Sequence, residues 1–170
     1  MIRLQDTEMF HYTDKELLKT IKDSFISLEQ YWLRLWETTH KDYCQDYETT
    51  NKEVKTLKEN IKRHEDKVKS ALAVLDERYV ERKWYSIVFD RRIRCNKYEY
   101  HKYNFTEYFI TFPNTIGKDT RIWHCFNSMM DDMEDELLNH SLVKKDGFDI
   151  RYGDYDFSIY FQKDEIWRNG

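Results

Sequence analysis

Basic and aromatic side chains gather between Arg82 and Tyr103, where the sequence has its most distinctive chemistry. Lysine and arginine bind phosphate and flat rings stack on unpaired bases, so the combination is typical of a single-stranded nucleic-acid platform. The residues that would bind are Arg91, Arg92, Arg94, Lys97, Tyr98 and Tyr100. The alternative, which the pattern favours, is a sheet whose edge arginines discourage aggregation and whose aromatics pack inward.

Other residues of catalytic or metal-binding type are not arranged as a site. The acidic run from Asp131 to Glu136 has carboxylates at helical spacing, which could bind a divalent ion but is more typical of a solvated helix face. His40 with Cys44, and His124 beside Cys125, supply too few ligands for tetrahedral zinc. No phosphate loop or nucleophile motif occurs, so we expect no metal, no cofactor and no enzymatic activity.

The elements that would position these side chains begin with a seven-residue apolar repeat near the N-terminus. Thr13 and Glu16 form a capping-box pattern that predicts a helix start, and Thr50 and Glu53 repeat it. The two helices would present apolar seams with alternating spacings of three and four. The seam residues are Leu18, Ile21, Phe25, Leu28, Trp32 and Leu35, then Val54, Leu57, Ile61, Val68, Ala71 and Leu75.

Residues 38–50 lack apolar spacing and are rich in short polar side chains, so we expect the chain to reverse there. The prediction is a long helical hairpin of coiled-coil type over residues 1–82. A single rod of about 100 Å is the alternative, because no Gly or Pro precedes Pro113. The sequence leaves open whether the hairpin closes within one chain and whether paired helices run parallel or antiparallel.

The first helix has more apolar surface than one partner helix covers, whereas His64 and Arg78 interrupt the second seam. This surplus predicts a homodimer through the two seams. It also predicts a partner-binding surface at Tyr31, Leu33, Trp36 and Trp84.

From residue 83 the period changes to two, which predicts a small α+β domain over residues 83–170. We expect a strand from Trp84 to Arg94, a turn at Asn96 and Lys97, and a second extended stretch from Tyr98 to Phe112. Two strands separated near Asn104 are the alternative for this stretch. A helix capped by Asp119 should follow, and its apolar side would comprise Ile122, Phe126, Met129, Met133 and Leu137.

The last predicted element is a hairpin with a two-residue loop at Gly153 and Asp154. That loop would pair Tyr152 with Tyr155, Ile150 with Phe157, and Phe148 with Ile159. The resulting architecture is a ββαββ antiparallel sheet with one helix packed on one face. The N-terminal helices would pack on the other face.

The amino-acid composition restricts the class of protein. The chain has 170 residues, a net charge of −4, and three cysteines in no metal or redox spacing, which is typical of reduced thiols in a cytoplasmic protein. It has no apolar run of membrane length and no signal-peptide core, so we expect it to be soluble and to have no membrane partner. Four glycines and thirteen tyrosines are typical of small phage-encoded proteins, which would place it in the host cytoplasm.

These observations favour a non-enzymatic protein–protein interaction protein. We expect a coiled-coil dimer that acts by steric occlusion or bridging of a macromolecule, with a phage-encoded inhibitor of a host protein as the biological hypothesis. The alternative is a single-stranded nucleic-acid-binding module that uses residues 82–103.

Overall fold

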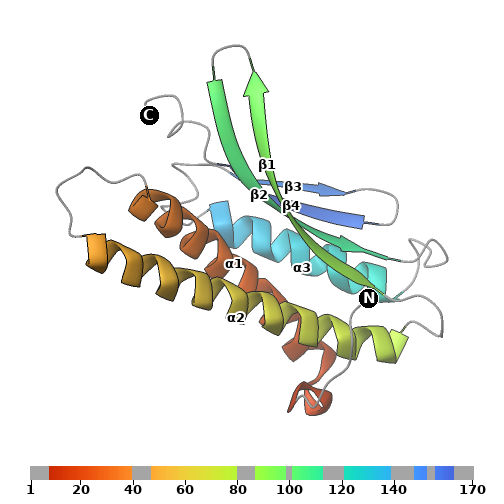
Figure 1. Ribbon diagram of the computed structural model, residues 1–170. Helices are drawn as coiled ribbons and strands as arrows, with labels where there is room; N and C mark the ends of the chain where they lie inside the picture. Colours follow the sequence, from red (N-terminus) through yellow and green to blue (C-terminus); the bar gives the residue numbers. More distant parts are fainter. Residues whose placement is uncertain are drawn as a thin grey trace.

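The fold is known from a computed structural model that describes residues 8–39, 47–79, 87–98, 101–112, 121–138, 148–152 and 156–162. The predicted α+β class is confirmed (Figure 1). The elements in chain order are the 3-10 helix η1 (Glu8–His11), α1 (Asp14–Thr39), α2 (Tyr47–Tyr79), β1 (Val88–Tyr98), β2 (His101–Thr111), α3 (Arg121–Leu138), β3 (Phe148–Tyr152) and β4 (Asp156–Gln162). Among the described helices, none combines the length and apolar character that a membrane span requires.

The first helix starts where its capping residues predict. The Thr13 hydroxyl accepts the Glu16 N–H at 3.2 Å and lies 3.1 Å from the Glu16 carboxylate, and the Thr13 carbonyl accepts the Leu17 N–H. The predicted start of the second helix at Thr50 is wrong, because α2 already begins at Tyr47. Glu48 favours this earlier start, since an acid in the first turn complements the helix dipole.

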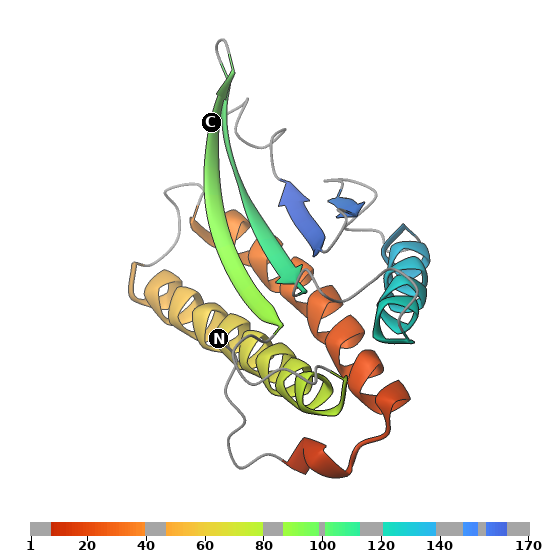
Figure 2. The same cartoon turned by 90° about the vertical axis from the view of Figure 1, so that its right-hand side faces the viewer.

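The two long helices form an antiparallel hairpin within one chain (Figures 1 and 2). An ion pair between Arg78 near the end of α2 and Asp14 at the start of α1 fixes this direction. The single-rod alternative is therefore wrong. Seam residues from both helices are buried together, including Ile21, Phe25, Leu28, Leu35, Leu57, Ile61, Val68 and Leu75, while Leu18, Trp32 and Val54 pack at its margin.

The sheet has the strand order β1-β2-β4-β3 with antiparallel neighbours. In the β1–β2 pair, Val88 lies opposite Thr111 and Tyr98 lies opposite His101. Asn96 and Lys97 belong to β1, so the turn predicted there is wrong, and the chain reverses between Tyr98 and His101. Since β4 pairs with β2 only from Phe105 to Thr111, the end of the β1–β2 ribbon extends past the other strands (Figure 2).

The register predicted for the last hairpin is also wrong. Tyr152 pairs with Phe157 rather than Tyr155, and Ile150 pairs with Ile159 rather than Phe157. The pairing is displaced by two residues. Because side chains alternate with a period of two, this displacement leaves the same residues on the same face, so apolar patterning alone could not distinguish the two registers.

All three α-helices lie on one side of the sheet (Figures 1 and 2). The Phe25 ring of α1 lies 5.6 Å from the Tyr108 ring of β2, and the Phe126 ring of α3 lies 5.0 Å from the Phe112 ring. Tyr108 and Phe112 are an even number of residues apart, so they share a face. The expectation that α3 and the helical hairpin cover opposite faces is therefore wrong, and one core contains residues of both predicted segments, 1–82 and 83–170.

Candidate interaction groove

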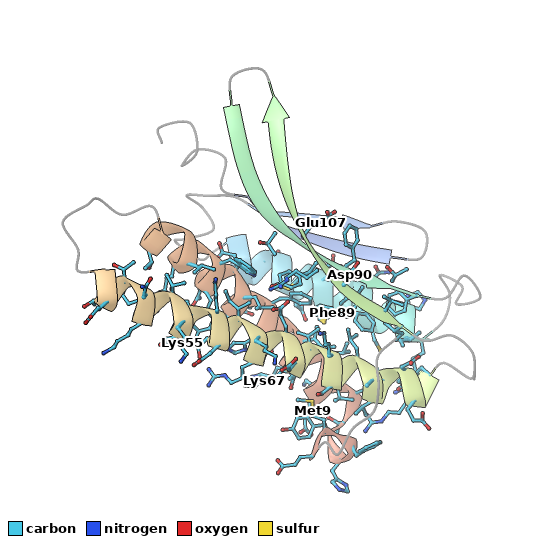
Figure 3. The ribbon with its side chains drawn as sticks, in the orientation of Figure 1. Met9, Lys55, Lys67, Phe89, Asp90 and Glu107 are labelled. Carbon is cyan, nitrogen blue, oxygen red and sulfur yellow. The ribbon has the colours of Figure 1, made fainter. Side chains whose placement is uncertain are left out.

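A groove of about 710 Å³ runs between α2 and β1, and we call it the α2–β1 groove. Trp32, Leu35, Ile61 and Phe89 supply its apolar lining, and Figure 3 shows Phe89 and Asp90 on the β1 side. The charged lining comprises Lys58, Lys62, Glu65, Asp66 and Lys69 of α2, with Asp90 and Arg91 of β1. An apolar base with a charged rim is the anatomy of a binding surface for a macromolecule.

Arg91 is held in this groove by two interactions. Its Nη1 donates to Glu65 Oε1 at 3.0 Å, and its guanidinium carbon lies 5.5 Å from the centre of the Trp32 ring. Arginine suits both contacts, because its planar group pairs with carboxylates and stacks on aromatic faces. The side chain remains 40% exposed, so Arg91 is positioned and still accessible from the groove.

The base of the groove is rigid because its aromatic residues support one another. Trp32 Nε1 donates to the Tyr108 hydroxyl at 2.6 Å, and the Tyr108 ring stacks on Phe89 with centroids 5.7 Å apart. Burial raises the pKa of the Tyr108 hydroxyl well above its ordinary value, and the nearby Glu65 charge raises it further. Tyr108 therefore stays neutral and serves as a fixed acceptor for Trp32.

Two opposing effects act on the pKa of the Glu65 carboxyl group. Burial raises the pKa of Glu65 above its ordinary value, although the charges of Arg91 and Lys69 act in the other direction. The side chain is only 11% exposed, so desolvation outweighs attraction to Arg91. The ion pair is consequently a positioning contact for Arg91 with little net stabilising effect.

Lys58, Lys62 and Lys69 are exposed along the groove wall. Within the described ranges, none of these lysines forms an ion pair or a hydrogen bond. Figure 3 shows Lys67 on the side of α2 away from the sheet. The groove therefore has positive charge available for a ligand. Lys55 lies on the same helix, about one turn before Lys58, but does not line the groove.

The predicted partner-binding residues do not gather at this groove. Tyr31 is half-buried, stacks on His64 with ring centroids 5.5 Å apart, and lines a second groove of about 640 Å³ between α1 and α2. Leu33 and Trp36 lie in α1, but their side chains are outside the described part of the structure. Trp84 lies outside the described residues altogether.

The residues predicted for nucleic-acid binding are distributed along β1. Arg91 lines the groove, whereas Arg92, Arg94, Lys97 and Tyr98 follow it in the strand, with Arg92 opposite Glu107 and Lys97 opposite Lys102. Tyr100 lies outside the described residues. The predicted nucleic-acid-binding residues in β1 thus start at the groove and continue along the extended end of the β1–β2 ribbon.

The acidic run of α3 has the character of a solvated helix face. Asp131, Asp132, Asp135 and Glu136 are exposed, and Glu136 pairs with Lys22 of α1 at 3.0 Å. In the part of the chain that the structure describes, no group of three His, Cys, Asp or Glu side chains could hold a metal ion. His124 is exposed and Cys125 half-buried, while His40 and Cys44 lie outside the described residues.

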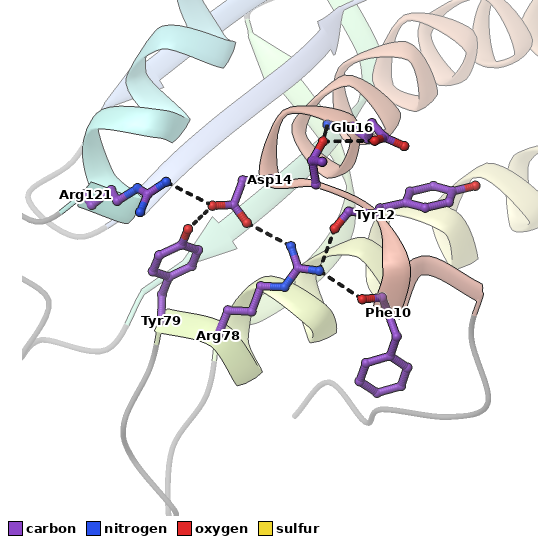
Figure 4. Close-up of polar contacts among 8 residues, drawn as sticks. Phe10, Tyr12, Asp14, Glu16, Arg78, Tyr79 and Arg121 are labelled. Carbon is purple, nitrogen blue, oxygen red and sulfur yellow. Dashed lines mark hydrogen bonds and ion pairs between the residues drawn. The ribbon is translucent and has the colours of Figure 1, made fainter.

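A second charged cluster lies where helix ends meet (Figure 4). The Asp14 carboxylate accepts from Arg78 at 2.8 Å and from the Tyr79 hydroxyl, and lies 3.5 Å from Arg121. Arg78 also donates to the carbonyls of Phe10 and Tyr12. This Asp14 cluster explains why arginine occupies a seam position: it joins η1, α1, α2 and α3.

Comparisons with protein-family models, curated proteins and solved structures found no match, so the site is interpreted from its own geometry. Sequence reasoning missed the α2–β1 groove and assigned Trp32 only to a seam. One signal was present: Arg91 shares the strand parity of Ile87 and Phe89, which are buried. A charge on an apolar strand face indicates a nearby partner charge, here Glu65.

Proposed function

We propose that the protein is a non-enzymatic protein–protein interaction protein that binds its partner through the α2–β1 groove. The observation that carries this proposal is the apolar lining of Trp32, Leu35, Ile61 and Phe89 beside lysines that form no ion pair with described residues. Buried aromatic anchors and a polar rim are what protein interfaces use to combine affinity with specificity.

The aromatic residues of the groove are less suited to nucleobases. A base-stacking platform needs open ring faces, but the Arg91 guanidinium covers Trp32 and the Phe89 ring stacks on Tyr108. Phe89 is also only 9% exposed. Aliphatic side chains of a protein partner can pack against the remaining edges, which favours a protein over a strand of bases.

Occupancy of the groove would allow the protein to act by steric occlusion or bridging of its partner. A phage-encoded inhibitor of a host protein remains our biological hypothesis.

Homodimerisation is a separate proposal. Since the seams are buried within one chain, the groove at Tyr31 is the surface that a dimer would use. Light scattering that gives a dimer mass for the wild type and a monomer mass for Tyr31→Glu would support homodimerisation through this groove. A monomer mass for the wild type would exclude it.

The test of the proposed function is comparative affinity capture from nuclease-treated lysate of the source cell. We expect the wild type and Lys55→Glu to retain the same protein, and Lys58→Glu/Lys62→Glu to lose it. Both variants alter exposed residues of α2, so both should keep the wild-type melting temperature. Equal capture by all three proteins would contradict binding through the groove.

A second candidate function is single-stranded nucleic-acid binding, favoured by the charge of α2 and by the ribbon beside it. Seven exposed basic residues of α2 outnumber three exposed acids between Lys52 and Lys69. The basic residues are Lys52, Lys55, Lys58, Lys62, Arg63, Lys67 and Lys69, and the acids are Glu53, Glu59 and Asp66. Phosphate binding would give an affinity for oligothymidylate that falls steeply with salt, and no binding at low salt would exclude it.

A further inference from the structure

We propose that the partner enters the α2–β1 groove as an extended acidic segment that adds a strand to the outer edge of β1. This inference rests on the proposed function and names the partner's local conformation and charge. It draws on three features of the groove: the backbone edge of β1, the dimensions of the groove and the lysines of α2.

The first feature is the edge of the sheet. β1 is the outermost strand in the order β1-β2-β4-β3, so one of its sides has no neighbouring strand among the described residues. The Ile87 N–H donates to Asp76 of α2 at 3.2 Å, and the Arg91 N–H donates to the Asp90 carboxylate at 2.9 Å. Alternate amides of a strand point to the same side, so the Phe89 amide between them also faces this edge. Of these three amides, those of Ile87 and Arg91 already donate to carboxylates, which an added strand would replace as acceptors.

The second feature is the size of the groove. Lys58 and Lys69 are eleven residues apart on α2, which corresponds to about 16 Å along the helix, or the length of about five residues of strand. An extended chain added to β1 would run along this length beside the strand, so the groove matches about five residues of an added segment.

The third feature is charge. Lys58, Lys62 and Lys69 line the wall opposite β1 and form no ion pair within the described part of the chain. Arg91 is accessible from the same groove, and these four basic residues outnumber the three acidic lining residues Glu65, Asp66 and Asp90. A segment added to β1 would present every second side chain to the apolar lining and could direct acidic side chains toward these lysines. The occupant that fits is therefore an extended segment in which acidic and apolar residues alternate.

The experiment measures fluorescence anisotropy of a labelled octapeptide in which Glu and Val alternate, with three matched probes. The first replaces each Glu with Lys, the second has the same composition at helical spacing, and the third carries N-methyl groups on alternate amides. We expect the Glu–Val peptide to bind at least tenfold more tightly than each of them. Lys58→Glu/Lys62→Glu should reduce that affinity at least tenfold, and Lys55→Glu less than twofold.

Two outcomes would overturn the inference. Equal binding of the N-methylated peptide would exclude strand addition, and binding of the Glu–Val peptide no tighter than the Lys–Val peptide would exclude an acidic segment. Either result could occur while affinity capture still depends on Lys58 and Lys62, in which case the groove binds a protein in another conformation. Tighter binding of oligothymidylate than of the Glu–Val peptide would overturn the inference in favour of nucleic acid.

Discussion

The Asp14 cluster and the α2–β1 groove are both charged regions built on α2, but they differ in how their charges are used. In the Asp14 cluster, Arg78 donates to one carboxylate and two carbonyls, and the carboxylate itself accepts from two side chains. In the groove, Arg91 forms an ion pair, but three neighbouring lysines form none among the described residues. The first region joins elements of the fold, whereas the second has charge available for a ligand.

The two regions should affect different properties: the Asp14 cluster should affect stability, and the groove should affect binding. Changes in the Asp14 cluster should destabilise the fold without altering the groove, because Arg78 and Tyr79 lie at the C-terminal end of α2, whereas the groove is lined by residues from Lys58 to Lys69 of that helix. Changes in the groove wall should alter binding with little effect on stability.

Arg78→Ala should lower the free energy of unfolding by about 2 kcal/mol, because it removes the charged partner of Asp14 and the donor to two carbonyls. Chemical denaturation measures the change. Arg78→Lys keeps the charge but not the planar fork, so its loss should be intermediate. An unchanged denaturation midpoint for Arg78→Ala would show that the cluster does not hold the helix ends together.

Tyr108→Phe should destabilise the protein by about 1 kcal/mol, because the Trp32 indole N–H loses its acceptor at the base of the groove. The ring packing against Phe89 and Phe25 is retained. Thermal unfolding measures the loss, and Tyr31→Phe is a matched control that removes a hydroxyl elsewhere. Equal stability of Tyr108→Phe and wild type would indicate that this hydrogen bond has no net effect.

Glu65→Gln should stabilise the protein at pH 7, on the order of 1 kcal/mol, because the ionised carboxylate is buried at a net cost. Since folding raises the pKa of Glu65, its contribution is favourable below the ordinary pKa and is lost as pH rises through the folded value. The difference between variant and wild type should therefore disappear toward pH 4. A variant less stable than wild type at pH 7 would show that the Arg91 pair is net stabilising.

The same substitution should also change the affinity of the groove for its ligand. Removing the negative charge from Glu65 leaves Arg91 without a competing carboxylate, so the alternating Glu–Val peptide should bind more tightly to Glu65→Gln. Isothermal titration of the peptide measures this change. A weaker affinity would mean that Glu65 is needed to position Arg91 for the ligand.

His64→Leu should reduce the pH dependence of stability between pH 7.5 and pH 5.5, with an effect below about 1 kcal/mol. Burial, followed by the charges of Lys67 and Arg63, lowers the pKa of His64. The stability from neutral His64 is therefore present above its ordinary pKa and is lost as pH falls toward the folded value. Thermal melts at both pH values test this, and equal pH dependence in wild type and variant would exclude His64 as the cause.

Much of the fold followed from local patterns. The seven-residue repeat predicted the two packed helices, the Thr13 cap placed the first helix start, and the apolar side of α3 matches its buried residues Ile122, Phe126, Met129 and Met133. These features succeed because periodicity and capping are local properties of the chain. The turn at Asn96 and Lys97 failed because favourable turn residues do not override continued strand pairing to Tyr98.

The groove could not be predicted in the same way. It depends on α1, α2 and β1 meeting at Trp32, Glu65 and Arg91, which are far apart in the sequence. The seam pattern located Trp32 and the strand pattern located Arg91, but neither indicates that one side chain covers the other. Tyr31, a predicted partner-binding residue, stacks on His64, and Phe89 stacks on Tyr108, so both rings pack within the chain.

Site-specific photocrosslinking tests most directly whether a protein partner occupies the α2–β1 groove. A photoreactive amino acid replaces Lys62 in one protein and Lys55 in another, and each is irradiated in lysate of the source cell. We predict a protease-sensitive, nuclease-resistant adduct from position 62 and little adduct from position 55. Equal adducts from both positions, or an adduct from position 62 that nuclease removes, would contradict binding of a protein partner in the groove.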